Sequence, residues 1–261
     1  MASVYQYGDR EAAIVTLRRI STAIDQRLSG MVAGDDTLAA EFQTAQQGIE
    51  DETALTDPSL QMLAGYLQSA IRQPSLIAGP LDDRFDAFSF LADDCLALLT
   101  SIEVTGYGRW QVKTVELALA SVLTSMARVI TTSVPDTRVH AIAVADRILT
   151  KFWDIVDALD TVAESFNAAD WDARYFSQST TYTIAARMIA ECVRYLLKSA
   201  YDLRVEKRFT IRNATAPVVL AIEEYPNYEI ERGMDLLIKA NALTGDEILL
   251  LPVGREIVVY V

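Results

Sequence analysis

The sequence predicts a mainly α-helical protein: an antiparallel helical bundle over residues 1–205, followed by a small C-terminal β-α-α-β domain over residues 206–261. Three observations lead to this prediction. Apolar residues recur every three or four positions through the first 200 residues, which is the period of an amphipathic helix. Short breaks separate these stretches, so neighbouring helices are expected to pack antiparallel. After residue 205, apolar residues alternate with polar ones, as in a half-buried strand.

Composition and charge narrow the class of protein. Of 261 residues, 51% are hydrophobic and only 7 are proline, which is typical of a folded chain with a buried core. The formal net charge of −13 opposes a broad DNA or RNA surface, because it repels phosphate backbones. The longest uncharged apolar stretch, residues 117–127, is shorter than the about 20 residues of a membrane span. We therefore expect no membrane and no nucleic-acid partner, and the first residues predict no secretory signal peptide.

The first helix is predicted from a single apolar face and ends near Gly30. Its apolar positions are Ile14, Leu17, Ile24 and Leu28. Residues 29–58 are polar and predict a loop with one weak helix near residues 38–47. Asp57 is expected to cap a helix that begins at Pro58, because proline lacks the amide hydrogen that a first turn leaves unbonded.

Four longer helices complete the predicted bundle. A break at residues 78–80 precedes a helix over residues 82–102. The clearest helix follows, with its apolar seam at Val112, Val115, Leu119, Val122, Met126 and Val129. Asp136 is expected to cap the next helix, which extends to about Phe166. A helix over residues 178–204 is apolar around much of its circumference, so we expect a central position or a partner on its second side.

The C-terminal stretch predicts two strands and two short helices. Phe209 and Ile211 alternate with polar neighbours as in a strand, and Thr215 is expected to cap the helix that follows. The second helix is marked by Leu236, Leu237, Ile238 and Leu243. A turn over residues 252–254 then leads into a final apolar strand around Val258.

No set of residues carries a catalytic, cofactor-binding or metal-binding signature, and we predict none of these sites. The single histidine, His140, starts a helix and has no nucleophile motif to serve. One histidine and two distant cysteines, Cys95 and Cys192, cannot supply the usual zinc spacing, and both cysteines are expected to be buried small hydrophobes. The tryptophans are expected to be core or interface anchors: Trp110, Trp153 and Trp171.

Charged residues form two local groups. Asp154, Asp157, Asp160 and Glu164 make an acidic ladder at helical spacing. Such like charges destabilise an isolated helix, so Lys151 one turn away or a basic partner is expected to offset them; a solvated face and a protein interface both remain open. Basic residues cluster before and within the C-terminal domain, and we interpret them as counter-charges to nearby carboxylates: Arg204, Lys207, Arg208 and Arg212.

The C-terminal domain resembles a LysM-type fold in its β-α-α-β order. The matching positions include the opening strand at 209–211, Asn241 after a helix, and Pro252-Val-Gly254 before the last strand. Residues 216–225, 237–241 and 251–254 look like the C-terminal end of the DNA circularisation (circulation) proteins of Mu-like phages, which are tail and baseplate components.

The resemblance implies a non-enzymatic structural protein of a contractile phage tail, placed in the baseplate or at a tube-end hub. Its implied partners are tube, hub or sheath neighbours, in multiple copies of a symmetric assembly, within the virion and, during assembly, the host cytoplasm. Sugar-binding LysM domains commonly carry Gly-Asp-Thr after the first strand, whereas this chain has Asn213-Ala-Thr215, which favours protein docking. The alternatives are a peptidoglycan-binding LysM-type protein and an all-helical enzyme with an unrecognised acidic site.

Overall fold

The computed structural model describes the chain apart from residues 1, 52–56, 104–107, 170–178, 204, 227 and 261. The protein is mainly helical with a small two-stranded sheet, which confirms the predicted fold class at this level. The helices are α1 (Ala2–Val32), α2 (Asp36–Asp51), α3 (Asp57–Arg72), α4 (Leu81–Thr100), α5 (Gly108–Thr132), α6 (Arg138–Ala169), α7 (Ser179–Asp202), α8 (Pro217–Glu224) and α9 (Ile230–Asn241). The strands are β1 (Glu206–Thr210) and β2 (Glu256–Tyr260), and the 3-10 turns are η1 (Gln73–Leu76) and η2 (Gly245–Ile248).

The chain divides into two compact units. The helical unit comprises residues 1–134 and 145–195, and the C-terminal unit comprises residues 135–144 and 196–261. The division falls within α6 and α7, whereas the sequence placed a boundary at 205/206, beside the start of β1. Of the net charge of −13, the residues of the helical unit carry −11.

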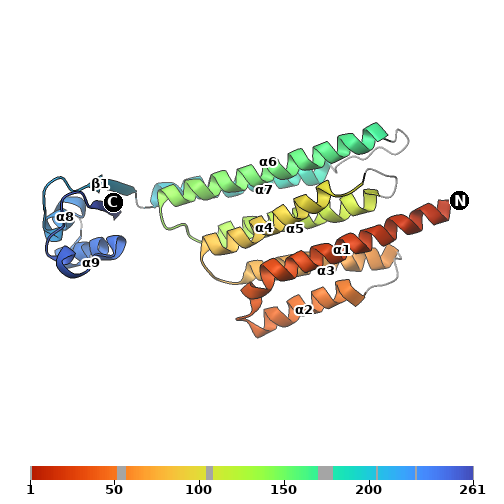
Figure 1. Cartoon of the computed structure of the whole chain (residues 1–261), viewed down its shortest axis with the longest axis horizontal. Helices are drawn as coiled ribbons and strands as arrows, with labels where there is room; N and C mark the ends of the chain where they lie inside the picture. The colour runs from red at the N-terminus through yellow and green to blue at the C-terminus, as the bar shows by residue number, and fades with distance from the viewer. Residues whose placement is uncertain are drawn as a thin grey trace. The chain divides into compact units, whose positions relative to one another are not determined.

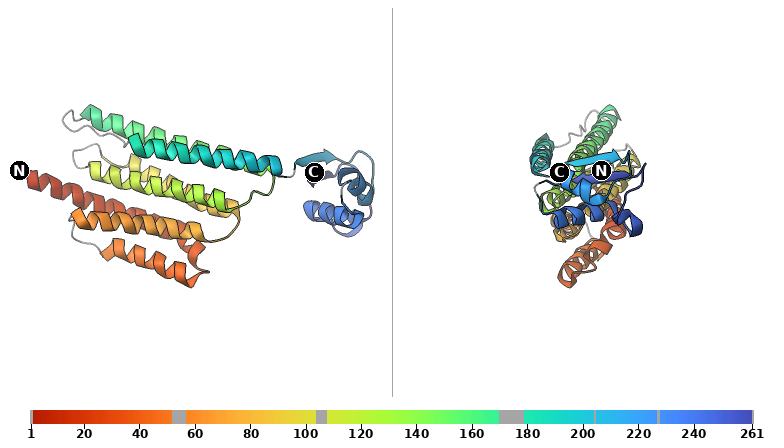
Figure 2. Two further views of the ribbon diagram at one scale, coloured as in Figure 1. Left: turned by 180° about the vertical axis from the view of Figure 1, so that it is seen from behind. Right: turned by 90° about the vertical axis from the view of Figure 1, so that its left-hand side faces the viewer.

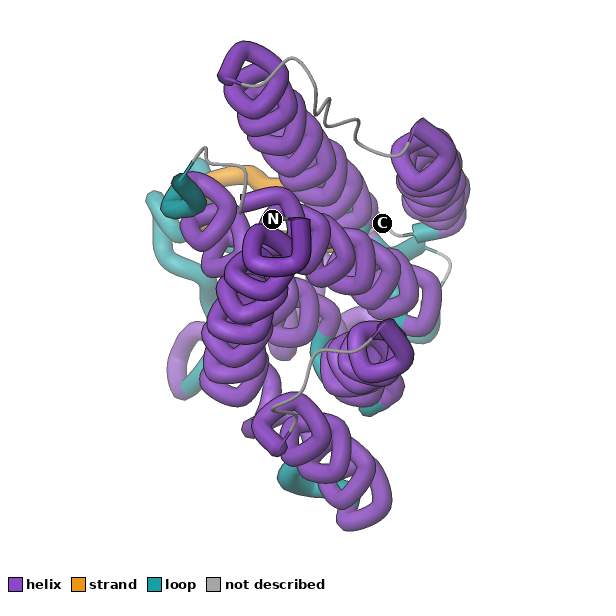
Figure 3. Tube along the Cα trace, turned by 90° about the vertical axis from the view of Figure 1, so that its right-hand side faces the viewer, coloured by secondary structure: helices purple, strands orange, loops and turns teal. Residues whose placement is uncertain are grey.

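Helices α1, α3, α4 and α5 run lengthwise beside one another in the helical unit, and α2 packs against α1 and α3 (Figures 1 and 3). The predicted seam of α5 is confirmed, because all six of its apolar positions are fully buried. Facing α4 contributes Phe85, Phe88, Leu91 and Cys95, and α1 contributes Leu17, Ile24 and Leu28. An apolar repeat of three and four therefore becomes a helix at the centre of a bundle.

Ion pairs join α4 to its neighbours. Asp94 accepts from Arg27 of α1 at 2.7 Å, and Asp93 accepts from Lys151 of α6 at 2.6 Å. Arg147 of α6 contacts two further acids of α4, Asp82 at 3.0 Å and Asp86. Asp82 and Asp83 lie in the first turn of α4, whereas Asp93 and Asp94 bind basic residues of other helices.

The weak helix predicted near residues 38–47 is present, but it is longer than expected and replaces most of the predicted loop. A regular helix, α2, runs from Asp36 to Asp51, and Asp35 caps it by accepting from the amides of Thr37 and Leu38, both at 3.0 Å. The burial of Phe42, Ala45 and Ile49 shows that α2 needs only a narrow apolar stripe. Packing of one narrow apolar face can stabilise a helix that is otherwise polar. The polar composition of this segment therefore did not reveal the full length of α2.

Two predicted helix caps are wrong. At the start of α6 the hydroxyl of Thr137, and not Asp136, accepts from the amide of His140 at 3.1 Å. At the start of α8 the N-cap residue is Ala216, and the Thr215 hydroxyl donates to the Asn213 carbonyl at 2.7 Å. The predicted cap at Asp57 concerns a side chain outside the described residues.

Residues Trp110–Thr132 of α5 are long and apolar enough, by length and composition, to cross a membrane. The sequence-based expectation considered only the shorter stretch over residues 117–127 and missed this length. The residues that make α5 apolar are buried against α1, α3 and α4. A core helix of a bundle passes the same test, so α5 by itself is weak evidence for a membrane.

In the C-terminal unit, β1 and β2 pair antiparallel, with Lys207 opposite Val259 and Phe209 opposite Ile257. Helices α8 and α9 cover one face of this sheet (Figure 2). The shared core is Ile211, Leu220, Tyr225, Leu237, Leu243, Leu251, Ile257 and Val259. Between α9 and β2 the chain turns through Ala242, whose φ of 47° ends the helix in the left-handed region.

Candidate functional site: an apolar surface on the C-terminal unit

A short β-bridge ties two loops of the C-terminal unit together. The Thr215 amide donates to the Leu251 carbonyl at 3.3 Å, and the Leu251 amide donates to the Thr215 carbonyl at 2.9 Å. The Gly254 amide donates to the Ile211 carbonyl at 2.8 Å, with Gly254 at a φ of 87° that favours glycine. These bonds fix the loop before α8 beside the segment that precedes β2.

Exposed aliphatic side chains flank this bridge on both chain segments. On the segment before β2, Leu249 is 75% exposed and Val253 is 64% exposed, while Leu251 between them is fully buried. We call the exposed set the apolar loop surface: Val218, Val219 and Ile222 of α8, with Ile248, Leu249, Leu250 and Val253. The exposure of these apolar side chains makes this surface the candidate functional site.

The apolar loop surface is chemically uniform. Its seven side chains are aliphatic and carry no group that donates a proton, attacks a substrate or binds a metal. Binding would come from removing apolar area from water, at about 25 cal/mol per Å² buried. The sequence singled out the Pro252–Gly254 turn but not the exposed leucines before it; a run of three leucines next to a proline was the available signal.

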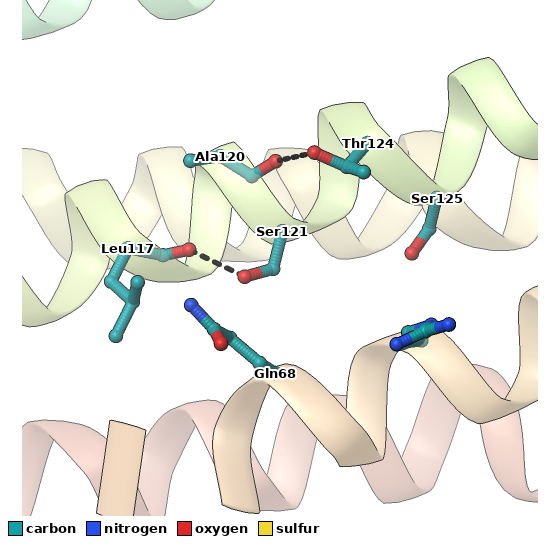
Figure 4. A pocket seen from close by; sticks show the side chains of 7 residues that line it. Gln68, Leu117, Ala120, Ser121, Thr124 and Ser125 are labelled. Atoms are coloured by element: carbon teal, nitrogen blue, oxygen red, sulfur yellow. Dashed lines mark hydrogen bonds between the residues drawn. The ribbon is translucent and has the colours of Figure 1, made fainter. Parts of the chain in front are cut away.

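Three pockets lined by described residues of the helical unit offer no catalytic set. The pocket in Figure 4 has a volume of about 240 Å³ and lies between α3 and α5. Its Ser121 and Thr124 hydroxyls donate to carbonyls of their own helix, those of Leu117 and Ala120, both at 2.8 Å (Figure 4). The other two pockets, of about 260 and 400 Å³, contain one carboxylate each, Glu103 and Glu41.

The acidic ladder lies on α6, where Asp154, Asp157, Asp160 and Glu164 are all exposed. Lys151, proposed as its offset, instead donates to Asp93 of α4. Within the described part of the chain, no ion pair neutralises the four ladder carboxylates. The two alternatives, a solvated face and a basic partner, therefore both stay open.

Among the described residues, neither His140, nor any group of metal-binding side chains, nor the tryptophans form a further candidate site. His140 Nδ1 accepts from the Asp136 amide at 3.3 Å, in the first turn of α6. Across the described residues, no three side chains of His, Cys, Asp or Glu are grouped to hold a metal ion. Trp110 and Trp153 are 42% and 52% exposed, and Trp171 lies outside the described residues.

The basic cluster is in part a set of counter-charges, as predicted. Lys207 Nζ contacts both carboxylate oxygens of Glu224 at 2.7 Å, and Arg208 pairs with Glu206 on its own strand. The hydrogen bond and charge of Glu206 raise the pKa of Arg208. Arg212 is exposed, and Arg204 lies outside the described residues.

No protein-family model matches this sequence, and no curated protein matches it either. The fold and the site therefore define only a class: a mainly helical protein whose small sheet-containing C-terminal unit presents an apolar surface.

Both cysteines are free and buried, as predicted. Burial raises the pKa of the Cys95 thiol from 9.0 to about 12. The unfolded thiol therefore ionises first, and we expect the free energy of unfolding to fall by about 1.4 kcal/mol per pH unit from this group, from pH 9 towards 12. Denaturant titrations at pH 8, 9 and 10 should show a shallower loss in Cys95→Ala than in the wild type. Parallel losses in the two proteins would contradict the assignment.

Proposed function

We propose that this chain is a non-enzymatic structural component of a contractile phage tail, in the baseplate or at a tube-end hub, that acts through protein–protein contacts. The observation that carries the proposal is the apolar loop surface, in which seven aliphatic side chains flank one bridge of the C-terminal unit. Exposed aliphatic area of this kind suits burial against another protein in a permanent assembly.

The resemblance of the C-terminal unit to a LysM-type module supports the same function. Strand β1, helices α8 and α9 and strand β2 follow one another in the order of such a module. Asn241, one of its most diagnostic positions, joins α9 to β2 through bonds to the Val258 main chain. The resemblance to tail circularisation proteins supports a role of this module in a contractile tail, where it would link neighbouring subunits.

The apolar loop surface favours protein over glycan as the ligand. A glycan site needs hydrogen-bonding side chains for sugar hydroxyls, whereas this surface is aliphatic on both loops. An enzyme with an acidic site would bring carboxylates of different helices into one cavity. None of the three pockets described above does so.

The test is incorporation into particles. Quantitative mass spectrometry of purified tails should find the chain in a fixed ratio to the tube and sheath proteins. The double variant Leu249→Asp/Val253→Asp should stay folded but be lost from particles, because it places charge on the docking surface. Ile230→Asp, at a 54% exposed position of α9 outside this surface, is the matched control and should be incorporated normally. Absence of the wild-type chain from tails, with retention on peptidoglycan, would replace the proposal with the glycan-binding alternative.

A further inference from the structure

The two edges of the C-terminal sheet are not equivalent. On the outer edge of β2, the Val258 amide donates to Asn241 Oδ1 at 2.7 Å, and the Val258 carbonyl accepts from Asn241 Nδ2 at 2.8 Å. The Tyr260 amide donates to the Tyr225 hydroxyl at 3.1 Å. Side chains thus cover the β2 edge at both of these residues and prevent another strand from pairing there.

The outer edge of β1 has no such cover among the described residues. The Ile211 amide donates to the Arg255 carbonyl of the β2 side at 2.9 Å. Because main-chain directions alternate along a strand, Lys207 and Phe209 also face β2, and Glu206, Arg208 and Thr210 face outward. No hydrogen bond among the described residues engages the outward amide or carbonyl of these three residues. An open strand edge is a template for pairing with another chain.

The face of β1 that carries Glu206 and Arg208 has a self-complementary charge pattern, and within one copy these two side chains pair with each other. Glu206 and Arg208 are two residues apart, so both side chains point to the same face of the sheet. If a second β1 lies antiparallel with its Arg208 opposite Glu206, its own Glu206 lies opposite the first Arg208. This register forms two hydrogen-bonded residue pairs and two reciprocal ion pairs, and cross-strand pairs of opposite charge stabilise a sheet.

The same register places Lys207 of one copy opposite Lys207 of the other. Like charges at this position would oppose pairing. Each Lys207, however, already binds both carboxylate oxygens of Glu224 at 2.7 Å, on the other face of the sheet. The repulsion at the twofold axis is therefore offset within each copy.

We propose that the chain forms a twofold-symmetric dimer by pairing β1 with β1 of a second copy, giving a four-stranded sheet in the order β2-β1-β1-β2. The contact is isologous and closes at two copies, because Asn241 and Tyr225 cover the remaining edges. The interface is small, so we expect a dissociation constant of about 10–100 μM in free solution. The proposal does not depend on the tail function, and it is tested on the isolated full-length chain.

Charge reversal provides the test, measured by sedimentation velocity from about 10 μM to 1 mM, a range that spans the expected dissociation constant. Glu206→Arg and Arg208→Glu each place like charges opposite one another twice, and each should weaken dimerisation at least about tenfold. The double variant restores opposite charges and should dimerise like the wild type. An equimolar mixture of the two single variants should form a heterodimer, because one contributes two basic and the other two acidic edge residues.

Two more variants separate edge pairing from effects on the fold. Arg208→Pro removes an amide that faces away from β2, so it should abolish the dimer while leaving the circular dichroism spectrum of the monomer unchanged. Glu223→Arg, an exposed charge reversal on α8, should leave the dimer intact. A wild-type monomer at 1 mM, single variants that dimerise like the wild type, or a mixture without heterodimer would each overturn the proposal.

Discussion

Replacing Arg84 by alanine is expected to lower the free energy of unfolding of the helical unit by about 3 kcal/mol or more. Arg84 is only 5% exposed. Its Nη1 donates to the Ser133 hydroxyl at 2.8 Å, and its Nη2 donates to the Ser75 carbonyl at 2.8 Å. The variant would leave these buried partners without a donor and would also open a cavity beneath α4.

The environment of Arg84 explains how a cation is tolerated there. Burial lowers the pKa of the guanidinium, and none of its described hydrogen bonds goes to a carboxylate. Its partners Thr132 and Ser133 lie at the C-terminal end of α5, where the helix dipole is negative. Arg84 thus joins η1, α4 and the end of α5 through hydrogen bonds and the dipole.

Denaturant unfolding followed by tryptophan fluorescence measures this effect, because Trp110 and Trp153 lie in the helical unit and the C-terminal unit contains no tryptophan. Arg84→Met is the matched variant: it keeps most of the side-chain volume and removes both the charge and the donors. We expect Arg84→Met to be less destabilising than Arg84→Ala, because it also removes the cost of burying a charge. Equal stability of Arg84→Ala and the wild type would show that these hydrogen bonds contribute nothing net.

Periodicity predicted the long helices, because burial of one face governs both the pattern and the packing. The seam of α5 and the apolar positions of α1 were read directly from spacing. Helix α2 was predicted only as a short, weak helix, because its stripe of Phe42, Ala45 and Ile49 is narrow within a polar segment. The caps at Asp136 and Thr215 were misplaced by one residue each, because neighbouring residues compete for a cap and sequence alone does not decide between them.

Long-range partners were not predictable from the sequence. Lys151 was assigned to the acidic ladder on its own helix, yet it binds Asp93, which is 58 residues away. The apolar loop surface could not be predicted for a related reason. Within one run of leucines, Leu251 is buried and Leu249 is exposed. Only the bridge between Leu251 and Thr215 determines which of these leucine side chains faces the core. Asn241 was identified as a diagnostic position, but its contact with β2 became evident only from the fold.

Asn241→Ala is expected to destabilise the C-terminal unit by about 2–4 kcal/mol. The Asn241 carboxamide exchanges two hydrogen bonds with the Val258 main chain and donates a third to the Leu237 carbonyl at 2.9 Å. Alanine would leave the outward amide and carbonyl of Val258 without these partners. In a two-stranded sheet that is marginal by itself, this loss should reach the whole unit.

Hydrogen exchange resolves this prediction residue by residue. The Val258 amide should exchange at least about tenfold faster in Asn241→Ala, while the tryptophan-reported unfolding of the helical unit stays unchanged. Lys239→Ala, an exposed change on the same helix, should leave Val258 protected.

Asn241→Asp separates the two bonds, because a carboxylate still accepts from the Val258 amide but repels its carbonyl. Asn241→Asp should therefore be at least as destabilising as alanine near neutral pH and should recover partly in acid, where the protonated carboxyl can donate. Unchanged Val258 exchange in both variants would mean that the sheet, and not Asn241, holds β2 in place.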